Sequence, residues 1–417
     1  MQLRFLGGAG EVGRSSILLT DGTRLMLDYG IKLNHKIDYP IAMPEIDALV
    51  LSHAHLDHSG YAPALYNEMM VPAFGTEPTL ELSELLLNDS LNIAKKQHMK
   101  QRFHKRQISS FMHRYMSLGY HSRASIGGLG IEFFDAGHIC GSAMALIERK
   151  NSKDNKRVLY TGDFKMLPQY LHKGAEKVEC DVLITESTYA TREHPDKESL
   201  AKDLVDKIKE TLDNNGTVLL PVFAVGRSQE ILSLLCKSNL TQYTYVDGMA
   251  RAATAIVLKN SDYISNHGLL EKAVGESMTI RDRFDRGDAL NSPSIIMTTA
   301  GMLSGGPVLD YITRLRKNSR IFITGYQVEG SNGRMLLESG MVMLNNRQMR
   351  ISAPAHYYDM SAHAGMKELH EYAKGSGAKK IICVHGDSAN AAALSESLKL
   401  EGYDAYAPKI GDVIRID

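Results

Sequence analysis

One short polar segment constrains the fold more than any other part of the chain. It follows an apolar run, residues 46–51, that predicts a buried strand, and it contains His53, His55, Asp57 and His58. Neutral imidazole and carboxylate groups suit zinc, and a catalytic zinc site keeps one coordination position open for water. The spacing H-x-H-x-D-H predicts that the first two histidines reach one ion and that Asp57 and His58 reach a second. The alternative, a polar loop with histidines by chance, explains so dense a cluster poorly.

The same pattern recurs further along the chain, where apolar segments end in residues that can bind metal. The residues that follow predicted strands in this way are His138, Asp163, Glu186 and His385. In α/β folds, ligands bind beyond the carboxyl ends of the strands. The recurrence therefore predicts that histidine and carboxylate groups from distant parts of the sequence form one site at one edge of a sheet.

The middle of the chain has a different pattern. Between residues 197 and 324, predicted helices alternate with predicted strands, which indicates a mostly parallel sheet with helices on both faces. Loops that contain Gly226, Gly305 and Gly330 are expected beyond the strand ends, where backbone amides and helix N-termini bind phosphates. Ordinary loop glycines are the alternative. After residue 350 the pattern of the first part returns, which indicates that the middle is inserted.

The opening glycines make a dinucleotide-binding fold an alternative that must be weighed. Residues 8–13 match G-x-G-x-x-G, and Asp28 follows at a distance that resembles the fingerprint. That fold needs a helix directly after the glycines. Here residues 15–28 favour two strands joined by an Asp-Gly turn. We expect instead a tight glycine loop near the metal site.

A long stretch without acidic residues is the most unusual feature of the charge pattern. Residues 90–131 contain no Asp or Glu, and the segment from 79 to about 117 is predicted to be largely helical. The basic residues of the stretch are Lys95, Lys96, Lys100, Arg102, Lys105, Arg106, Arg114 and Arg123. Such a stretch indicates a surface that faces a polyanion, and a solvated helix face is the alternative.

Composition narrows the class of protein. The 417 residues include 48 basic and 48 acidic side chains, so polyanion binding depends on local patches rather than on net charge. The four cysteines form no C-x-x-C pair, which fits a reducing compartment. No apolar run is long enough for a membrane span, and the N-terminus has no signal-peptide pattern. We expect a soluble cytoplasmic protein.

Taken together, these motifs resemble those of the metallo-β-lactamase superfamily, and in particular of its β-CASP nuclease branch. The residues similar to the lactamase motifs are His53, His55, Asp57 and His58, then Asp28, His138 and Asp163. The residues similar to the three motifs that define the branch are Glu186, His363 and His385. The opening Gly-Ala-Gly-Glu-Val-Gly-Arg-Ser is most similar to archaeal proteins related to the cleavage and polyadenylation specificity factor. The N-terminal KH domains of the longer archaeal form and the C-terminal extension of bacterial RNase J are not expected here.

The resemblance implies an α/β fold with two parts. An αββα metallo-β-lactamase sandwich would be formed by residues 1–188 and 350–417, and an α/β β-CASP domain with a mostly parallel sheet would be inserted as residues 189–349. The resemblance also implies two zinc ions per chain. Two adjacent metal ions lower the pKa of a shared water and hold a phosphate in line for attack.

The resemblance further implies a role for each motif residue. His53, His55 and His138 would hold one zinc, Asp57, His58 and His385 would hold the other, and Asp163 would bridge them. Asp28 would orient a ligand histidine without binding the metal itself. The expected catalytic residues are His363, Glu186 and Asp57, with His363 as general acid held by Glu186. A structural loop histidine is the alternative for His363.

The expected function is that of a zinc-dependent ribonuclease with endonuclease activity, 5′→3′ exonuclease activity or both, which leaves 5′-phosphate and 3′-hydroxyl ends. Candidate RNA contacts are Arg227, Ser331, Arg334 and Ser361. RNA is the expected partner, a homodimer is usual among similar proteins, and other RNA-processing subunits are compatible with the resemblance. The alternatives are a non-catalytic RNA-processing scaffold, a DNA-processing nuclease of the same fold, and a small-molecule hydrolase.

Overall fold

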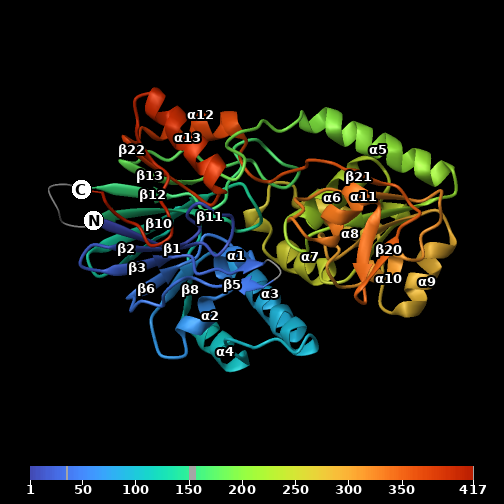
Figure 1. Cartoon of the computed structure of the whole chain (residues 1–417), viewed down its shortest axis with the longest axis horizontal. Helices are drawn as coiled ribbons and strands as arrows, with labels where there is room; N and C mark the ends of the chain where they lie inside the picture. The colour runs from blue at the N-terminus through green and yellow to red at the C-terminus, as the bar shows by residue number, and fades with distance from the viewer. Residues whose placement is uncertain (34–35, 150–155, 417) are drawn as a thin grey trace. The chain divides into compact units, whose positions relative to one another are not determined.

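The computed structural model describes residues 1–33, 36–149 and 156–416, and over these residues the chain forms two compact units (Figure 1). Unit 1 comprises Met1–Pro168, His172–Glu193 and His363–Asp417. Unit 2 comprises Gln169–Leu171 and His194–Ala362. This division agrees with the prediction that the middle of the chain is inserted into the first part. The domain boundaries expected from the sequence, at 188/189 and 349/350, stay a prediction.

Unit 1 contains two sheets of seven strands each among the described residues. The first has the order β24 (Val413–Arg415), β1 (Gln2–Gly7), β2 (Ser16–Thr20), β3 (Arg24–Leu27), β6 (Ala48–Val50), β7 (Ala73–Gly75), β8 (Tyr115–Ser117). The second has the order β23 (Asp404–Tyr406), β22 (Lys380–Val384), β13 (Val182–Glu186), β12 (Arg157–Tyr160), β11 (Ala143–Arg149), β10 (Leu129–Asp135), β9 (Arg123–Ile126). A short hairpin, β4 (Lys32–Leu33) with β5 (Ile37–Asp38), stands apart from both.

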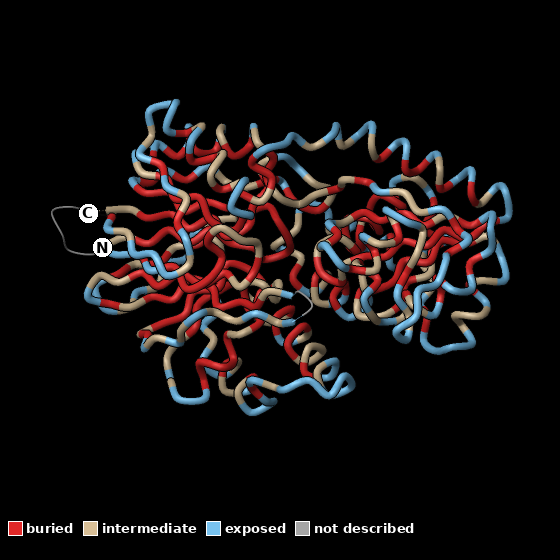
Figure 2. The backbone as a smooth tube through the Cα atoms, in the orientation of Figure 1, coloured by how far each residue is buried: buried red, intermediate tan, exposed pale blue. Residues whose placement is uncertain are grey.

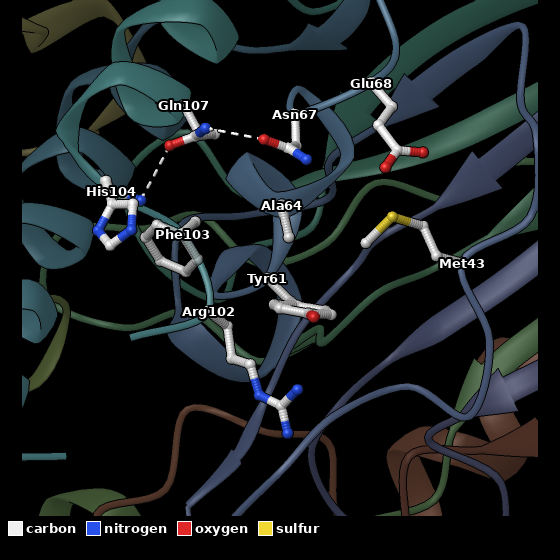
Figure 3. Close-up of a pocket in the computed structure, with 9 residues that line it drawn as sticks. All are labelled: Met43, Tyr61, Ala64, Asn67, Glu68, Arg102, Phe103, His104 and Gln107. Atoms are coloured by element: carbon white, nitrogen blue, oxygen red, sulfur yellow. Dashed lines mark hydrogen bonds between the residues drawn. The ribbon is translucent and has the colours of Figure 1, made fainter. Parts of the chain in front are cut away.

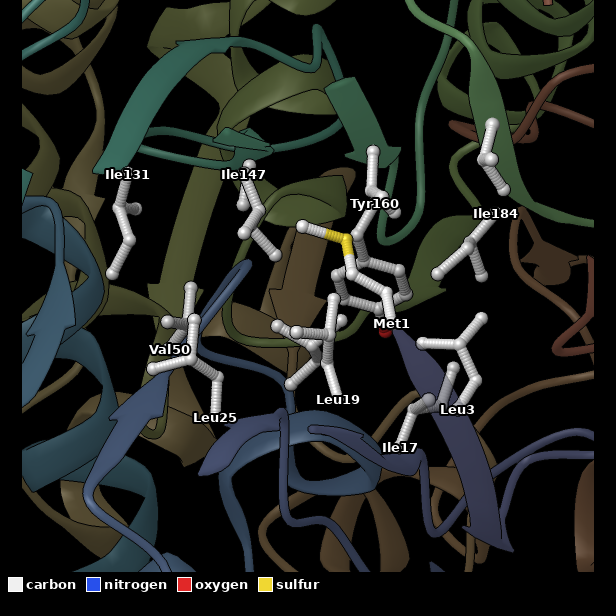
Figure 4. Packing of buried hydrophobic residues seen from close by; sticks show 14 of the residues in the cluster. Met1, Leu3, Ile17, Leu19, Leu25, Val50, Ile131, Ile147, Tyr160 and Ile184 are labelled. Atoms are coloured by element: carbon white, nitrogen blue, oxygen red, sulfur yellow. The ribbon is translucent and has the colours of Figure 1, made fainter. Parts of the chain in front are cut away.

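The two sheets pack face to face through a common apolar core (Figure 4). Leu19 and Val50 from the first sheet and Ile147, Tyr160 and Ile184 from the second belong to this cluster, and each is at most 2% exposed. Alternate residues of a strand point to opposite faces, so each sheet has a second apolar face left to cover.

Helices cover the two outer faces. On the first sheet lie α1 (Leu56–Ser59), α2 (Ala62–Leu65), α3 (Glu77–Lys96) and α4 (Lys105–Arg114). On the second sheet lie α12 (Met366–Ser376) and α13 (Ser388–Leu400). Figure 2 shows the same division in burial, with buried strands inside and exposed residues along the outer sides of these helices. The predicted αββα sandwich is confirmed.

Unit 2 is built on one sheet in which every recorded strand pair is parallel. Its order is β16 (Met278–Thr279), β15 (Thr244–Asp247), β17 (Ser294–Thr298), β14 (Thr217–Pro221), β18 (Arg320–Ile323), β21 (Ala355–Tyr357). The helices are α5 (Lys197–Asp213), α6 (Arg227–Lys237), α7 (Ala250–Lys259), α8 (His267–Glu276), α9 (Arg283–Asn291), α10 (Val308–Ile312) and α11 (Asn332–Ser339). A hairpin of β19 (Met341–Leu344) and β20 (Arg347–Arg350) follows α11. The α/β insertion with a mostly parallel sheet is also confirmed.

The glycine loop at the N-terminus leads into a strand and not into a helix. Strand β2 follows the glycines and pairs antiparallel with β1, which excludes the dinucleotide-binding fold. The loop lies at the candidate site, because the Gly8 carbonyl accepts the backbone N–H of His385 at 2.7 Å. Gly8 and Gly10 adopt φ angles of 70° and 71°, a region that glycine enters without strain.

The structure adds detail to the predicted helical segment and to the end of the chain. The segment from 79 to about 117 is largely helical, as predicted, but residues 97–104 separate α3 from α4 and residues 115–117 form β8 at the edge of the first sheet. The described chain ends in two short strands, β23 in the second sheet and β24 in the first. In the described part of the chain, no helix combines the length and apolar character that a membrane span requires.

Candidate metal centre

The metal-ligand candidates of unit 1 lie in loops and helix starts that follow strands of both sheets. The segment after β6 leads through His53 and His55 into α1, which carries Asp57 and His58. His138 follows β10, Asp163 follows β12, and His385 follows β22. The sequence pattern of a strand followed by a ligand therefore corresponds to a common edge of the sandwich, where residues up to several hundred positions apart converge.

The first group of donors combines three histidines with one carboxylate: His53, His55, His138 and Asp163. Nδ1 of His55 lies 3.2 Å from Nε2 of His53 and 3.3 Å from Nε2 of His138. Oδ2 of Asp163 lies 3.6 Å from Nε2 of His53. One atom from each residue lies within 4.8 Å of the others, which is close enough for a single ion to be bound by all four.

The second group shares Asp163 with the first and adds Asp57, His58 and His385. Nε2 of His58 lies 3.3 Å from Oδ2 of Asp163, and Nε2 of His385 lies 3.3 Å from Oδ2 of Asp57. Nδ1 of His385 lies 2.7 Å from the other oxygen of Asp163. Asp163 thus presents its carboxylate to both groups, as a bridging ligand would.

The donor atoms of these groups are better suited to binding divalent metal ions than to forming hydrogen bonds with one another. Nε2 of His58 and both ring nitrogens of His385 are buried and lie close to carboxylate oxygens, but none of these contacts has the geometry of a hydrogen bond. A buried polar atom without a partner is costly, and a metal ion is one of the few partners that several lone pairs can share. Imidazole and carboxylate donors are the set that Zn²⁺ and similar ions prefer.

Asp28 holds His58 in place from behind. Its Oδ2 accepts hydrogen bonds from Nδ1 of His58 at 2.6 Å and from the hydroxyl groups of Ser52 and Tyr160 at 2.7 Å each. Its Oδ1 accepts the backbone N–H of Ser52 at 2.7 Å. A carboxylate that accepts the far ring N–H of a histidine fixes the tautomer in which Nε2 carries the lone pair. The contact supports the orienting role expected for Asp28.

The charges of the site shift the pKa values of its members in opposite directions. Burial alone would lower the pKa of His58, but the carboxylates of Asp163 and Asp28 raise it well above its ordinary value. Burial, reinforced by the neighbouring His58, lowers the pKa of His53 well below its ordinary value. Burial would raise the pKa of Asp163, yet His385 and His58 hold it well below the usual range. Asp163 is therefore a carboxylate in this site, ready to bind a cation.

A third group lies beside the first two and includes a histidine with access to solvent. Nδ1 of His363 lies 3.0 Å from Oε2 of Glu186, and the His363 side chain is 22% exposed. Glu186 is the last residue of β13, and its Oε1 also accepts the backbone N–H of Phe164, next to Asp163, at 2.8 Å. Burial would lower the pKa of His363, but the Glu186 and Asp163 carboxylates raise it. This geometry is that of a proton donor held by a carboxylate.

A buried ion pair fixes the loop that carries His363 to the loop that carries Asp163. Glu368 lies in the first turn of α12, and its carboxylate accepts a hydrogen bond from the Lys165 ammonium at 2.6 Å. It also accepts hydrogen bonds from the backbone N–H groups of Met166 at 3.0 Å and Leu167 at 2.9 Å. It also accepts the backbone N–H of Gly365 at 3.0 Å. Burial would raise the pKa of Glu368, but Lys165 holds it below its ordinary value. The pair therefore positions two functional loops at once.

The sequence reasoning missed four residues of this site: Ser52, Tyr160, Lys165 and Glu368. Only Glu368 left a usable signal, since Gly365-x-x-Glu368 has the spacing of a capping box at a helix start. Lys165 lies two residues after Asp163, but nothing in the sequence pairs it with a glutamate 203 positions away. Ser52 and Tyr160 precede ligand residues and resemble ordinary strand-end residues.

The four candidate RNA contacts lie in unit 2, and two of them have structural roles there. Ser331 is the N-cap of α11, and its hydroxyl accepts the backbone N–H of Arg334. Arg334 pairs with Glu338 one turn later on the exposed side of the same helix. Arg227 begins α6 after Gly226, and Ser361 lies just before the His363 loop. Their contact with RNA stays a prediction.

Comparison with known families gives three matching stretches. Residues 2–213 match the family described as Anti-Pycsar protein Apyc1, residues 228–336 match the Beta-Casp domain, and residues 348–408 match the Zn-dependent metallo-hydrolase RNA specificity domain. The second match falls within unit 2, and the third includes both His363 and His385.

Several archaeal proteins are similar over all or nearly all of this chain. Probable RNase MJ4 of Methanocaldococcus jannaschii is 38% identical, with all of both chains covered. RNase aCSPSF2 of Saccharolobus solfataricus is 33% identical over 99% of this chain and 85% of its own. Transcription termination factor FttA of M. jannaschii is 31% identical over all of this chain and 72% of its own. Among solved structures, a protein of unknown function from Enterococcus faecalis shares the fold, with a TM-score of 0.61, 16% identity and 99% of both chains covered.

Proposed function

The chain belongs to the β-CASP family of proteins with a metallo-β-lactamase fold, and from this membership we propose that it is a metal-dependent ribonuclease. Two relatives of similar length are named as RNases, and the third matching family is described as a Zn-dependent metallo-hydrolase RNA specificity domain. RNA is accordingly the proposed substrate, and hydrolysis of its phosphodiester bonds is the proposed reaction.

Two zinc ions per chain are the proposed cofactors. His53, His55 and His138 would hold one ion, Asp57, His58 and His385 would hold the other, and Asp163 would bridge them; the two donor groups that share Asp163 support this assignment. When bound, two such ions would supply Lewis-acid activation of a water molecule and of the phosphate.

The chain itself supplies proton transfer and orientation. Glu186 accepts from Nδ1 of His363, which leaves Nε2 as the ring position from which a proton is donated to the departing oxygen. Glu186 also holds the backbone next to Asp163, so the proton donor and the bridging carboxylate share one anchor. Asp28 keeps the ligand face of His58 turned toward the site. Asp57 is also proposed as a catalytic residue, because it belongs to the second group of metal donors.

The single observation that carries the proposal is the third donor group, in which His363 and Glu186 lie beside the shared Asp163. A purely structural metal site needs no partly exposed histidine supported by a buried carboxylate. A scaffold that has lost activity would not need the complete set of donors. A DNA-processing nuclease and a small-molecule hydrolase remain the competing enzymes.

The experiment that tests the function compares a circular RNA with its linear 5′-monophosphate twin, with zinc present or chelated. Opening of the circle only with zinc would establish endonuclease activity. Degradation of the linear form alone would establish 5′→3′ exonuclease activity. If zinc-loaded protein left both RNAs intact, the ribonuclease proposal would be wrong. A matched single-stranded DNA separates the DNA-processing alternative.

The proposed general acid is tested by His363→Ala. We expect turnover of RNA to fall by about 10²–10⁴, the usual contribution of general acid–base catalysis, while zinc content measured by elemental analysis stays unchanged. A loss of zinc in this variant would make His363 a ligand or a structural residue instead.

The proposal has further parts that need their own measurements. We propose that the domains are 1–188, 189–349 and 350–417, that the protein is cytoplasmic, and that a homodimer or other RNA-processing subunits are its assembly partners. The four cysteines are buried free thiols, which fits a reducing compartment. Cell fractionation, sedimentation and limited proteolysis would test these parts separately.

A further inference from the structure

We propose that unit 1 carries a second RNA-binding subsite, separate from the metal centre, in which the basic surface between α3 and α4 binds the backbone of single-stranded RNA and a neighbouring pocket takes one nucleobase. The surface, named here the α3–α4 tip, comprises residues 95–107. This inference rests on the proposed ribonuclease function for the identity of the polyanion, but it concerns residues to which no part of that function is assigned.

The α3–α4 tip is an unbalanced patch of positive charge. Its cations are Lys95, Lys96, Lys100, Arg102, Lys105 and Arg106, and each is exposed. Among the described residues, none of them forms an ion pair with a carboxylate within 4.0 Å, although Lys96 interacts electrostatically with Asp89. Some arginines elsewhere on the surface are paired, as Arg320 is with Glu210 and Arg123 with Glu132. Unpaired cations in a stretch without acids create a local positive potential that a neutral chain otherwise lacks.

A pocket of about 260 Å³ adjoins the tip (Figure 3). Its lining residues are Met43, Tyr61, Ala64, Asn67, Glu68, Arg102, Phe103, His104 and Gln107. Ala64 and Phe103 are only 4% and 8% exposed, so part of the pocket wall is apolar and fixed by packing. The volume is below the range of about 300–1,000 Å³ usual for drug-sized ligands, which favours one planar base over a larger group.

Aromatic stacking prepares one wall of the pocket. The Tyr61 ring lies 5.3 Å from that of Tyr29 in a stacked arrangement and 4.6 Å from that of Tyr39. The Arg102 guanidinium lies over the Tyr39 ring at 5.1 Å. A rigid aromatic group beside a cation is the combination that single-strand-binding proteins use, since every base has a face that stacks and every nucleotide has a phosphate.

Polar groups stand at both ends of the pocket. Gln107 donates from Nε2 to Oδ1 of Asn67 at 3.1 Å, and its own oxygen accepts the backbone N–H of His104 at 3.0 Å. Figure 3 shows Asn67 and Glu68 at one end and Arg102 at the other. Amide and carboxylate groups suit the edge of a base, whereas the guanidinium suits a phosphate, so the two ends match the two parts of a nucleotide.

The pocket is also connected rigidly to the metal-ligand segment. Tyr61 donates its backbone N–H to the Tyr29 carbonyl at 2.8 Å, and Tyr29 donates its own to the His58 carbonyl at 2.8 Å. Helix α1, with Asp57 and His58, leads directly into α2, with Ala64. RNA bound in the pocket would therefore be held at a fixed offset from the metal centre, which raises the binding of long RNA but not of a dinucleotide.

The test uses two zinc-loaded full-length variants that each lose four exposed cations. The tip variant combines Lys100→Gln, Arg102→Gln, Lys105→Gln and Arg106→Gln. The control variant combines Lys177→Gln, Lys374→Gln, Lys379→Gln and Lys399→Gln, all exposed and all outside the tip. The substrates are polyuridylate and the dinucleotide UpU, each measured over a series of salt concentrations.

We expect the tip variant to show a kcat/KM for polyuridylate at low salt that is about tenfold or more below that of the parent, while kcat/KM for UpU stays unchanged. The slope of log binding constant against log salt should become shallower by about 0.7 for each RNA phosphate that the removed cations neutralise in the parent. The control variant should behave as the parent. Equal decreases in both variants, or no decrease in the tip variant, would overturn the subsite. Parallel decreases on polyuridylate and UpU would show damage to the catalytic centre and would overturn it as well.

A second measurement locates the base. Irradiation of the complex with a 4-thiouridine RNA, followed by peptide mapping, should give adducts within residues 61–68 and 102–107. Adducts confined to other segments would overturn the pocket assignment even if the charge effect held. If the parent protein cleaved neither substrate, the proposed function would fail, and polyuridylate binding with cross-linking would still decide the subsite on its own.

Discussion

The two units of the chain both place polar residues at the carboxyl ends of their strands, but they bury different kinds of groups there. In unit 1 the buried residues include ionisable groups that lie close together: Asp28, His53, His58, His138, Asp163, Glu186 and His385. In unit 2 the polar residues buried at the strand ends are mainly hydroxyl and amide groups, such as Thr298, Thr324 and Gln327. Burying charge is far more costly than burying a hydroxyl group with a hydrogen bond. The buried donors of unit 1 therefore fit a bound cation, and no candidate metal group among the described residues lies in unit 2.

Two glutamates show the difference on a smaller scale. Glu368 in unit 1 accepts the backbone N–H groups of Met166 and Leu167, and Glu230 in unit 2 accepts those of Tyr170 and Leu171. Glu368 has the Lys165 ammonium as well, which lowers its pKa. Burial raises the pKa of Glu230, although its two backbone hydrogen bonds oppose the change. The same arrangement, a glutamate that accepts hydrogen bonds from two consecutive backbone N–H groups, therefore holds a loop of the candidate site in unit 1 and a connecting segment in unit 2.

The largest effect we expect comes from removing the metal. With zinc at about 1,000 times its dissociation constant, binding stabilises the folded state by about 4 kcal/mol, so chelation should raise amide exchange rates in unit 1 by about 10³. Hydrogen exchange with mass spectrometry would measure this at β12, β13 and β22, and RNA cleavage should be abolished in the same sample.

The internal control is the sheet of unit 2. Exchange in β14 and β17 should change little, because unit 2 contributes none of the donors in the candidate metal groups found among the described residues. If chelation raised amide exchange rates equally in the sheets of both units, the proposed difference between the units would be wrong, since the two units would then unfold together.

The next effect separates the two glutamates. Glu368→Gln leaves Lys165 buried without its partner and loosens the loop of Asp163, so we expect kcat to fall by about 10–100-fold with little change in KM. Glu230→Gln should lower the Tm but leave kcat within about twofold, because its hydrogen bonds are within unit 2. Steady-state kinetics and thermal melts on both variants would measure this.

A double variant distinguishes positioning from stability. Lys165→Met with Glu368→Gln removes the unpaired charge and should recover much of the decrease in Tm caused by Glu368→Gln, whereas kcat should stay low. Recovery of kcat together with Tm would mean that Glu368 contributes stability alone.

The smallest effect concerns an aspartate at the end of β10. Burial raises the pKa of Asp135 to about 6 from 3.8, and its hydrogen bond from Gly137 opposes the change only in part. Because the pKa of Asp135 is higher in the folded state than in the unfolded state, ionisation of Asp135 destabilises the folded protein. This loss of stability begins as pH rises through about 4 and is complete above about 6. Asp135→Asn should therefore stabilise the protein near pH 7 by at most about 3 kcal/mol, and should not do so below about pH 4.

Asp247, at the end of β15 in unit 2, is the matched position. It accepts from Nε of Arg286 and from the Tyr311 hydroxyl, each at 2.8 Å, so Asp247→Asn should destabilise the protein where Asp135→Asn stabilises it. Urea unfolding at about pH 4 and pH 7 would measure both. A gain for Asp135→Asn that is the same at both pH values would show that the charge of Asp135 is not its cause.

The sequence by itself determined the donors of the candidate site and the class of fold that holds them. Residue type and spacing are local properties, so His53, His55, Asp57 and His58 could be recognised after one apolar strand. His138, Asp163 and His385 follow other strands in the same way, and strands of a common sheet end at a common edge. The alternation of helices and strands was enough to predict the parallel sheet of unit 2.

Only the tertiary structure decided the partners of those donors. Asp28 meets Tyr160, and Lys165 meets Glu368, across 132 and 203 positions of sequence, and no local pattern encodes such a pair. The same holds for the pocket beside the α3–α4 tip, where Tyr61 and Phe103 come from separate helical segments. The sequence predicted that residues 79 to about 117 are largely helical, but it did not show that α3 ends at Lys96 or that residues 115–117 pair with the first sheet. Local preferences are worth only fractions of a kcal/mol per residue, and burial of side chains against distant segments outweighs them.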